Sequence, residues 1–499
     1  MLFNTPEYIL FLPIVVFVYY LVPKRLRYLW LLVVSYYFYM QWNPIYLSLL
    51  FLCTLITYIG GLILEQIKTN TDEKSSRRKK LCIILCIATS LGILGFFKYA
   101  SFGISLFNRA LSYIGITPVS CTLDILLPVG ISFYTLQALG YLIDVYRGDI
   151  YAEKNFFRYA LFVSFFPQLV AGPIERSKNL LVQLHEFCSI DYDKFRKGLM
   201  LILYGLFLKM VIADRAAIIV DTVYGDSSAY PGFYIIVATF FFAIQIYCDF
   251  YGYSTIARGS ALLMGITLMD NFQAPYFSKS VREFWRRWHI SLSGWFRDYL
   301  YIPLGGSRKG KARKEINRLF VFAVSGLWHG ASLAFLTWGL LNGIYQVLED
   351  MIDQLKQKLQ SLVGERTQMT ARFSKRLFQT MLTFFWVTAA WLFFRSGGLE
   401  ESIEILKSMF RCRNWIVLFD GSLYELGVAK NYMRVLLASI LVLFMVDYQK
   451  YHGKDVAEAF FRQGWWFRVT VIMTLVFTIL LYGCYGEMYD TQQFIYFQF

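Results

Sequence analysis

The chain has 499 residues, of which 57% are hydrophobic and 19% aromatic, and its mean hydropathy is +0.46. The apolar residues cluster in runs of about 17–25, the length needed to cross a hydrocarbon core of about 30 Å. This composition predicts an all-α, polytopic integral membrane protein and excludes a large soluble domain. The net charge of +15 lies mainly in short basic loops, which favours contact with an anionic membrane surface and excludes nucleic acid as the partner.

The apolar runs predict thirteen membrane segments. In chain order they are 7–22, 28–41, 45–64, 81–98, 126–146, 156–172, 198–213, 232–250, 253–269, 319–346, 378–395, 432–447 and 467–485. Basic clusters at 24–27, 74–80, 356–376 and 449–468 are expected to remain cytoplasmic. This rule places the N-terminus and the C-terminal tail outside. The first segment lacks a small-residue cleavage site, so we expect it to be retained as a helix.

Two of these segments have features of broken helices. Residues 156–172 contain Pro167, which favours a short or re-entrant segment, because non-helical backbone at membrane depth must be buried in protein or line a cavity. Residues 319–346 are too long for one upright helix, and we expect tilting or a break near Gly326 or Gly330.

Ionisable residues within the apolar segments are expected to face the interior of the protein. Lys209, Asp249 and Arg258 are of this kind, and charges at membrane depth are costly unless they pair or line a cavity. The eight cysteines contain no C-x-x-C pair. Cys82 and Cys86 share a helix face, which core packing explains better than a metal. We predict no metal site and no disulfide framework.

Residues 281–291 read Val-Arg-Glu-Phe-Trp-Arg-Arg-Trp-His-Ile-Ser, a basic and aromatic run that contains His289. Helical spacing places Arg282 and Arg286 on one face. An interfacial amphipathic helix anchored by aromatic residues and arginines is one interpretation. The other is a short helix that lines a substrate opening, with its arginines binding the phosphates of a donor.

His329 lies in the motif Ser-Gly-Leu-Trp-His-Gly at 325–330, inside a long apolar segment. A buried histidine can serve only to bond a backbone carbonyl. It can also act as a catalyst, because an apolar setting favours the neutral imidazole, which can accept a proton from a hydroxyl group.

The chain ends in Phe494-Ile-Tyr-Phe-Gln-Phe499. These residues can form an aromatic belt at the membrane surface. Alternatively, the hydroxyl group of Tyr496 and the terminal carboxylate can enter a pocket from outside. The composition of the tail does not distinguish between the two interpretations.

Taken together, these motifs resemble the membrane-bound O-acyltransferase (MBOAT) family, in particular the bacterial branch of alginate, polysaccharide and peptidoglycan O-acetyltransferases. The likeness is strongest at 171–174, 249–259, 271–306 and 325–330. The family fold implies a ring of transmembrane and re-entrant helices around a central tunnel. The resemblance also implies one membrane domain, 1–499, with N-terminal spans (1–100), a catalytic core (125–346), C-terminal spans (378–487) and an extracytoplasmic tail (488–499).

The resemblance assigns roles to three residues. It implies that His329 is catalytic and that His289 lies on the path to the reaction centre. The tail is similar to a Phe-(Leu/Ile)-Tyr-x-x-Phe ending in which the tyrosine carries the acyl group, which corresponds here to Tyr496. Related sequences usually have serine and aspartate where this chain has Tyr251 and Thr255, and asparagine where it has Ser307, so no family role is carried over to these positions. The expected donor-binding and tunnel residues are Trp285, Arg286, Arg287, Trp288, Trp328 and Asp249.

The implied reaction moves an acyl group, expected to be acetyl, from a cytoplasmic thioester such as acetyl-CoA to a cell-surface polysaccharide or peptidoglycan. No bound cofactor is expected. The implied partners are the lipid bilayer of a bacterial cytoplasmic membrane and an extracytoplasmic SGNH-type esterase or transferase. D-alanyl transfer to teichoic acid is the alternative enzyme function, and export of a lipid or polysaccharide is the alternative from another class.

Overall fold

The computed structural model describes residues 1–68, 73–117, 127–170, 172–187, 189–363, 373–485 and 494–495. The regular elements in these ranges are helices, and no strand occurs among them. The chain forms two compact units. Unit 1 comprises Met1–Ile202 and Tyr253–Met269, and unit 2 comprises Leu203–Gly252 and Asp270–Phe499. The all-α prediction is therefore confirmed.

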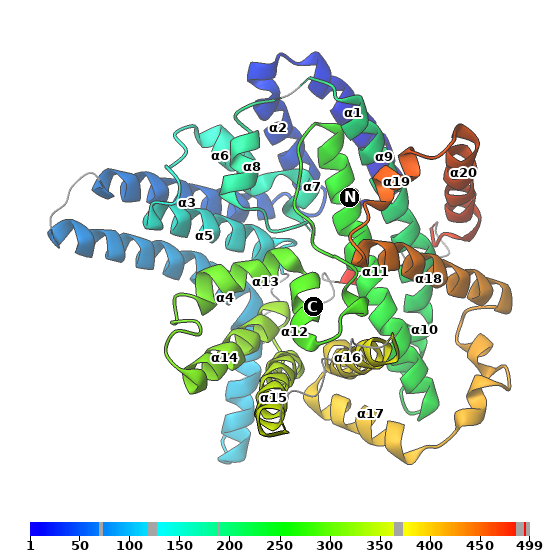
Figure 1. Ribbon diagram of the computed structural model, residues 1–499. Coiled ribbons are helices and arrows are strands. Elements are labelled where there is room, and N and C mark those ends of the chain that lie inside the picture. Colours follow the sequence, from blue (N-terminus) through cyan, green and yellow to red (C-terminus); the bar gives the residue numbers. More distant parts are fainter. Residues whose placement is uncertain are drawn as a thin grey trace. The chain divides into compact units, whose positions relative to one another are not determined.

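Six of the described helices are long and apolar enough to cross a membrane. They are α3 (Tyr46–Lys68), α4 (Glu73–Tyr113), α11 (Phe233–Leu263), α16 (Phe373–Arg395), α18 (Lys430–Tyr451) and α20 (Trp465–Tyr482) (Figure 1). The α1 helix (Pro6–Leu21) is apolar but shorter. A hydrophobic stretch as long as those in the six helices is the signature of a membrane-spanning helix.

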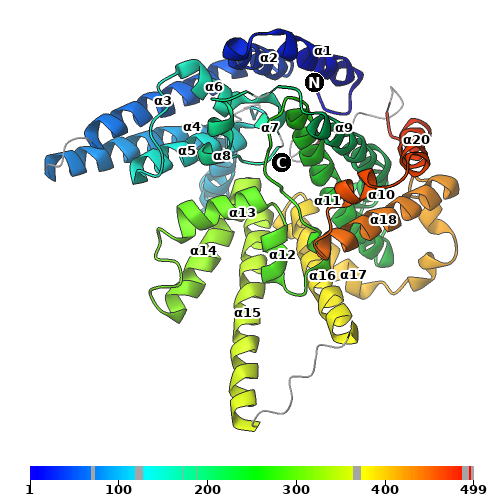
Figure 2. The same ribbon diagram turned by 45° about the horizontal axis from the view of Figure 1, so that its top comes forward.

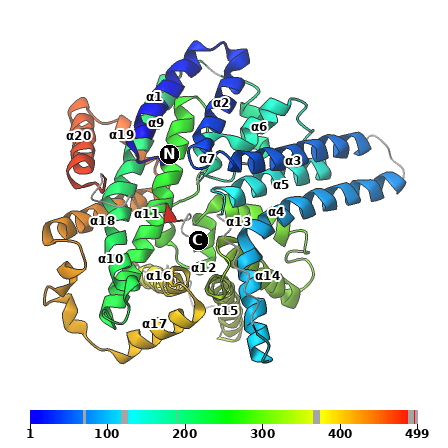
Figure 3. The same ribbon diagram turned by 180° about the vertical axis from the view of Figure 1, so that it is seen from behind.

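Unit 1 is built around α5 (Ile131–Arg147), which lies between α3 and α4 (Figures 1 and 3). Glycines in the left-handed conformation bound this helix, Gly130 at φ +76° and Gly148 at φ +82°. Glycine adopts such angles without the steric penalty of a side chain. The other elements of unit 1 are η1 (Lys24–Leu26), α2 (Arg27–Met40), α6 (Phe156–Ser164), α7 (Phe166–Leu169), α8 (Ser177–Gln183) and most of α9 (Tyr192–Leu206).

The predicted break in segment 156–172 is confirmed. Two short helices, α6 and α7, replace one long helix, and Pro167 lies in the first turn of α7. Proline is tolerated there because the first-turn N–H groups have no intrahelical acceptor. Both helices are largely buried, as irregular backbone within a membrane protein requires.

Glu175 follows this broken segment and is buried in unit 1. Its carboxylate accepts hydrogen bonds from the Met269 N–H at 2.5 Å and from Asn179 Nδ2 at 2.6 Å. Burial nevertheless raises the pKa of Glu175 to about 7, although these bonds and the charge of Arg258 oppose the rise. The folded protein therefore favours the protonated acid. The stabilisation is complete below the unfolded pKa of about 4.3 and is lost as the pH rises toward 7.

We expect Glu175→Gln to remove this pH dependence, because glutamine keeps the acceptor oxygen but does not ionise. At pH 8 the variant should be more stable than wild type by roughly 1–3 kcal/mol, and near pH 5 the two should converge. Thermal unfolding in detergent across this pH range measures the difference. Parallel curves for the two proteins would contradict the prediction.

Unit 2 contains the remaining elements. They are η2 (Phe207–Ala213), α10 (Asp214–Gly225), most of α11, η3 (Pro275–Phe277), α12 (Val281–Arg287), α13 (Ile290–Phe296), η4 (Arg297–Tyr301), α14 (Lys311–His329), α15 (Leu333–Val363), α16, α17 (Leu399–Arg411), η5 (Trp415–Leu418), η6 (Ser422–Glu425), α18, α19 (Val456–Phe461) and α20. The elements η2 and η4 are π-helical, a geometry that is often found at functional sites.

Segment 319–346 is broken as predicted, and the break comes at Gly330, which ends α14. The α14 and α15 helices form a hairpin in which α15 extends well beyond its partner (Figure 2). Glycines allow their close approach, since a Cβ on Gly326 would lie 2.3 Å from the Phe335 carbonyl oxygen. Farther along the hairpin, Asp350 pairs with Arg318 at 2.9 Å and with Lys314.

The prediction of two separate segments at 232–250 and 253–269 was wrong. A single helix, α11, runs from Phe233 to Leu263 through Gly252. This glycine marks a close contact rather than a break, because a Cβ there would lie 2.9 Å from the Gly205 carbonyl oxygen. One glycine within an otherwise apolar helix costs only about 1 kcal/mol, which the packing of α11 offsets.

Candidate active site

His289 connects α12 to α13 in unit 2. Ser280 caps α12 by accepting the Glu283 N–H at 3.0 Å. Asn271 holds the start of α13, since its carbonyl oxygen accepts the Ile290 N–H at 3.0 Å and its side chain accepts the Ser291 N–H at 3.3 Å. His289 itself adopts φ +44°, in the left-handed region. This conformation is uncommon for residues other than glycine and occurs preferentially at functional sites.

His329 is the last residue of α14, and its ring lies 6.4 Å from that of His289, between centroids. Both side chains are buried. Burial lowers the pKa of His289 to about 3, so its imidazole is neutral throughout the physiological pH range. Two motifs that are 40 residues apart in the sequence therefore bring their imidazoles together in one region of unit 2.

Aromatic side chains surround His329. Its ring centroid lies 4.8 Å from that of Trp328, 5.0 Å from that of Trp338 and 5.4 Å from that of Phe394. Trp338 in turn stacks on Trp391 at 5.4 Å. A wall of this kind excludes bulk water, and water exclusion limits the hydrolysis of reactive thioesters.

The described part of the C-terminal tail is buried in the same unit. Phe494 and Ile495 are 0% and 2% exposed. The Phe494 ring lies 5.7 Å from that of Phe250, and the Phe250 ring lies 4.6 Å from that of His289. Ring contacts thus connect the tail to the histidine pair. Tyr496 is the next residue along the chain and lies outside the described residues.

Asp249 also contacts the tail. Its Oδ2 atom accepts the Ile495 N–H at 2.7 Å, and its Oδ1 atom lies 2.7 Å from Lys209 Nζ. Lys209 pairs with Asp214 at the same distance. The prediction that Lys209 and Asp249 face the interior is confirmed, because both are buried.

Four of the expected donor-binding and tunnel residues, Trp285 to Trp288, differ in their exposure. Trp285 and Trp288 are buried, and Trp285 Nε1 donates to Asn342 Oδ1 at 3.1 Å. Arg287 pairs with Glu283 at 3.0 Å and lies over the Tyr451 ring. Arg286 is exposed. Of these four residues, Arg286 therefore has the side chain most accessible to a phosphorylated donor.

Arg282, which shares its predicted helix face with Arg286, has a structural environment. It pairs with Asp350 at 2.9 Å and Asp353 at 3.0 Å. Glu349 on the same helix, α15, accepts the N–H groups of Val281 and Arg282. These contacts fix the start of α12 on α15 and thereby orient the segment that leads to His289.

Sequence reasoning missed the residues that support the site from α18. Asp447 accepts the Tyr247 hydroxyl at 2.7 Å, and Lys450 donates to the Tyr251 hydroxyl. The Tyr247 ring lies 5.8 Å from that of Trp288, the residue before His289. The available signal was Asp447, a charged residue at the end of the predicted apolar segment 432–447. Lys450 was expected to belong to the basic cluster at 449–468 instead. Which side chains they contact depends on the tertiary fold.

Comparison with known proteins is decisive for the family. The chain is 37% identical to the probable alginate O-acetylase AlgI of Pseudomonas syringae pv. tomato, over 90% of this chain and 83% of that protein. The chain belongs to the membrane-bound O-acyltransferase family. The family model, described as MBOAT, membrane-bound O-acyltransferase family, matches residues 150–390. This range includes both histidine motifs.

Two other relatives extend the comparison. The peptidoglycan O-acetyltransferase of Helicobacter pylori is 33% identical, over 82% of this chain and 80% of its own length. The teichoic acid D-alanyltransferase of Bacillus subtilis is 25% identical over 48% of this chain and 62% of its own length. Together with the six apolar helices, these results make the protein a multi-pass membrane O-acyltransferase.

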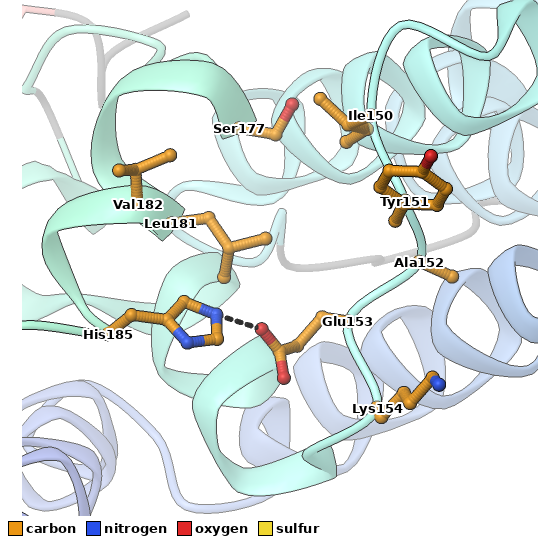
Figure 4. Close-up of a pocket in the computed structure, with 9 residues that line it drawn as sticks. All are labelled: Ile150, Tyr151, Ala152, Glu153, Lys154, Ser177, Leu181, Val182 and His185. Carbon is orange, nitrogen blue, oxygen red and sulfur yellow. Dashed lines mark hydrogen bonds and ion pairs between the residues drawn. The ribbon is translucent and has the colours of Figure 1, made fainter.

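A separate pocket of about 480 Å³ lies in unit 1 (Figure 4). The carboxylate of Glu153 points toward His185 across it, at 2.5 Å from Nε2. Glu153 also lies 3.6 Å from Arg158, and Ser177 on the pocket wall donates to Asp144 at 2.9 Å. None of the MBOAT motif residues predicted to be functional lines this pocket.

Proposed function

We propose that this protein transfers an acetyl group from a cytoplasmic thioester to an extracytoplasmic polysaccharide or peptidoglycan, with Tyr496 as an intermediate carrier. One observation carries the proposal. Phe494 in the tail is buried against Phe250, and Phe250 contacts His289, whose ring lies 6.4 Å from that of His329. An aromatic belt at a membrane surface would instead leave these tail residues partly exposed.

In the proposed first step, the neutral imidazole of His329 accepts the proton of the Tyr496 hydroxyl group. The phenolate oxygen attacks the thioester carbonyl, the C–S bond breaks, and the released thiolate takes up the proton. A tyrosine hydroxyl has a pKa of about 10 in water, so it requires a base near neutral pH. The products are an acyl-tyrosine on this chain and free coenzyme A.

In the second step, a sugar hydroxyl attacks the acyl-tyrosine ester, which restores the Tyr496 hydroxyl group. An extracytoplasmic SGNH-type transferase is the proposed catalyst of this step. The positive-inside rule, applied to the basic loops, predicts that the N-terminus and the tail lie outside the membrane, which we take to be a bacterial cytoplasmic membrane. Delivery by the tail therefore explains how a donor from the cytoplasm serves an acceptor outside.

His289 is proposed to position the donor or the acceptor rather than to act as the base. Its neutral ring has one N–H donor and one acceptor nitrogen, so it can orient a carbonyl or hydroxyl group. Arg286 and Arg287, at the end of α12, are proposed to contact the phosphates of acetyl-CoA. The ion pair of Arg287 with Glu283 leaves Arg286 as the stronger candidate.

The relatives support acetyl as the group that is transferred. The two acetyltransferase comparisons extend over at least 82% of this chain, whereas the D-alanyltransferase comparison extends over 48%. Both chemistries require the same general base and a thioester donor, so the histidines do not distinguish between them. Mass spectrometry of the acylated product distinguishes acetyl from D-alanyl, because the two groups differ in mass.

The experiment uses the purified full chain in proteoliposomes supplied with isotopically labelled acetyl-CoA. We expect thioester consumption and a labelled acetyl group on the C-terminal peptide, detected by mass spectrometry after proteolysis. Labelling from a D-alanyl carrier-protein thioester, but not from acetyl-CoA, would assign the alternative reaction. Absence of thioester consumption with every donor would favour a transport function instead.

A further inference from the structure

We propose that Asp249 sets the register of the C-terminal tail by accepting the main-chain N–H of Ile495, with Lys209 and Asp214 holding its carboxylate in place. The inference rests on the proposed function, in which the tail presents the acyl acceptor. Asp249 is here a positioning residue, because it acts on the tail backbone and not on the acyl group.

The geometry divides the two oxygens of Asp249 between two tasks. Oδ1 lies 2.7 Å from Lys209 Nζ, and Oδ2 accepts the Ile495 N–H at 2.7 Å. Lys209 also contacts Asp214 Oδ1 at 2.7 Å. The side chains of all three charged residues are at most 7% exposed. The ammonium group thus fixes the carboxylate on one side and leaves the other side directed at the tail.

The hydrogen bond between Asp249 and Ile495 is expected to be strong because both groups are buried. A buried charge is costly unless it is paired and hydrogen-bonded, and a buried backbone N–H requires an acceptor. Lys209 pairs with the charge of Asp249, and the bond from Ile495 satisfies the buried N–H and the second carboxylate oxygen. Hydrogen bonds from a backbone N–H to a carboxylate are short and about twice as strong as neutral ones.

The bond between Asp249 and Ile495 is one anchor of the C-terminal region. A second anchor holds the chain where α20 ends. Arg215 donates to the Tyr482 carbonyl oxygen at 2.8 Å, and the Met210 carbonyl oxygen accepts the Cys484 N–H at 3.0 Å. Met210 lies in the π-helical element η2, where the wider turn displaces carbonyl groups from the α-helical pattern. Lys209 belongs to the same element.

Both anchors contact main-chain atoms of the C-terminal region. The register of the tail is therefore independent of which aliphatic side chain occupies position 495. Phe494 then packs against Phe250, and a shift of one residue would move a different side chain to this contact. The clasp formed by Lys209, Asp214 and Asp249 therefore determines which tail residue packs against Phe250.

Protection of the tail tests the clasp without an acyl donor. The purified full chain in nanodiscs is treated with a carboxypeptidase, and the release of Ile495 and Phe494 is followed by mass spectrometry. Loss of a hydrogen bond to a charged group should speed this release about 10- to 100-fold in Asp249→Ala. Asp249→Asn retains an acceptor oxygen and should recover part of the protection.

The matched control is Asp447→Asn. Asp447 is equally buried in unit 2 but accepts the Tyr247 hydroxyl instead of a tail N–H. The tail of the Asp447→Asn variant should remain as protected from the carboxypeptidase as the tail of wild type. Equal release from wild type and Asp249→Ala would overturn the proposal. So would equal release from Asp447→Asn and Asp249→Ala, because protection would then follow from general packing.

A second measurement addresses the N–H group itself. Ile495→Pro removes the donor, since proline has no backbone N–H, whereas Ile495→Val keeps it. Acyl transfer to the C-terminal peptide should be at least about 10-fold greater in Ile495→Val than in Ile495→Pro. Where wild type acylates its C-terminal peptide, equal transfer in the two variants would overturn the clasp. The protection assay is independent of Tyr496 chemistry, so failure of the acyl-tyrosine step is recognised separately.

Discussion

His329→Ala is expected to reduce acetyl transfer from the thioester to the polymer by about 10²- to 10⁴-fold, the usual contribution of a general base. The loss is expected from the surroundings of His329 as well as from the basicity of its imidazole. His329 ends α14 in a wall formed by Trp328, Trp338 and Phe394, where bulk water cannot substitute as the base. Proteoliposomes with labelled acetyl-CoA and an added polysaccharide acceptor, together with the partner transferase, measure the loss.

Two comparisons make this result interpretable. His452→Ala changes a histidine in the exposed turn after α18 and should retain wild-type transfer. His329→Gln fills more of the cavity than alanine but supplies no proton acceptor of suitable basicity, and it should be as inactive. Thermal unfolding in detergent checks that both His329 variants remain folded. Undiminished acetylation by folded His329→Gln would remove this residue from the mechanism.

Tyr496→Phe is expected to abolish acyl transfer to the polymer, because the substitution removes the proposed acceptor oxygen and keeps the aromatic ring. Phe494 packs against Phe250, and the Ile495 N–H is bonded to Asp249, so the tail should retain its register. Acyl label on the C-terminal peptide should fall to background. Slow thioester hydrolysis should continue, because His329 is intact.

The control for this variant is Tyr113→Phe, which changes an exposed tyrosine at the end of α4. It should acylate its C-terminal peptide at the wild-type rate. Near-normal polymer acetylation by Tyr496→Phe would show that the sugar hydroxyl attacks the thioester directly. The clasp at Asp249 would then hold a tail with a structural role only.

The histidine motifs were accessible from sequence because their signals are local. A histidine within a long apolar segment is rare enough to indicate function, and His329 was identified on that basis. The break at Gly330 and the short helices around Pro167 were accessible for a similar reason, since glycine and proline restrict the backbone wherever they occur. Segment 319–346 also exceeded the length of one upright helix.

The contacts between distant segments were not accessible in this way. The sequence placed Lys209 and Asp249 in apolar segments, which predicted burial but not the identity of their partners. Similarly, the sequence predicted separate segments at 232–250 and 253–269, yet Gly252 between them lies within α11 and lets this helix approach Gly205. Each of these outcomes depends on which helix packs alongside, and that choice is made by the packing of the whole unit.

The sequence by itself determined the class of protein, the membrane environment and the two histidine motifs, because apolar length and residue type act locally along the chain. Only the tertiary structure decided that the imidazoles lie together and that Phe494 and Ile495 are buried with them. The physical reason is that a buried charge and a buried N–H must find partners. Asp249 and Ile495, 246 residues apart, satisfy that requirement together.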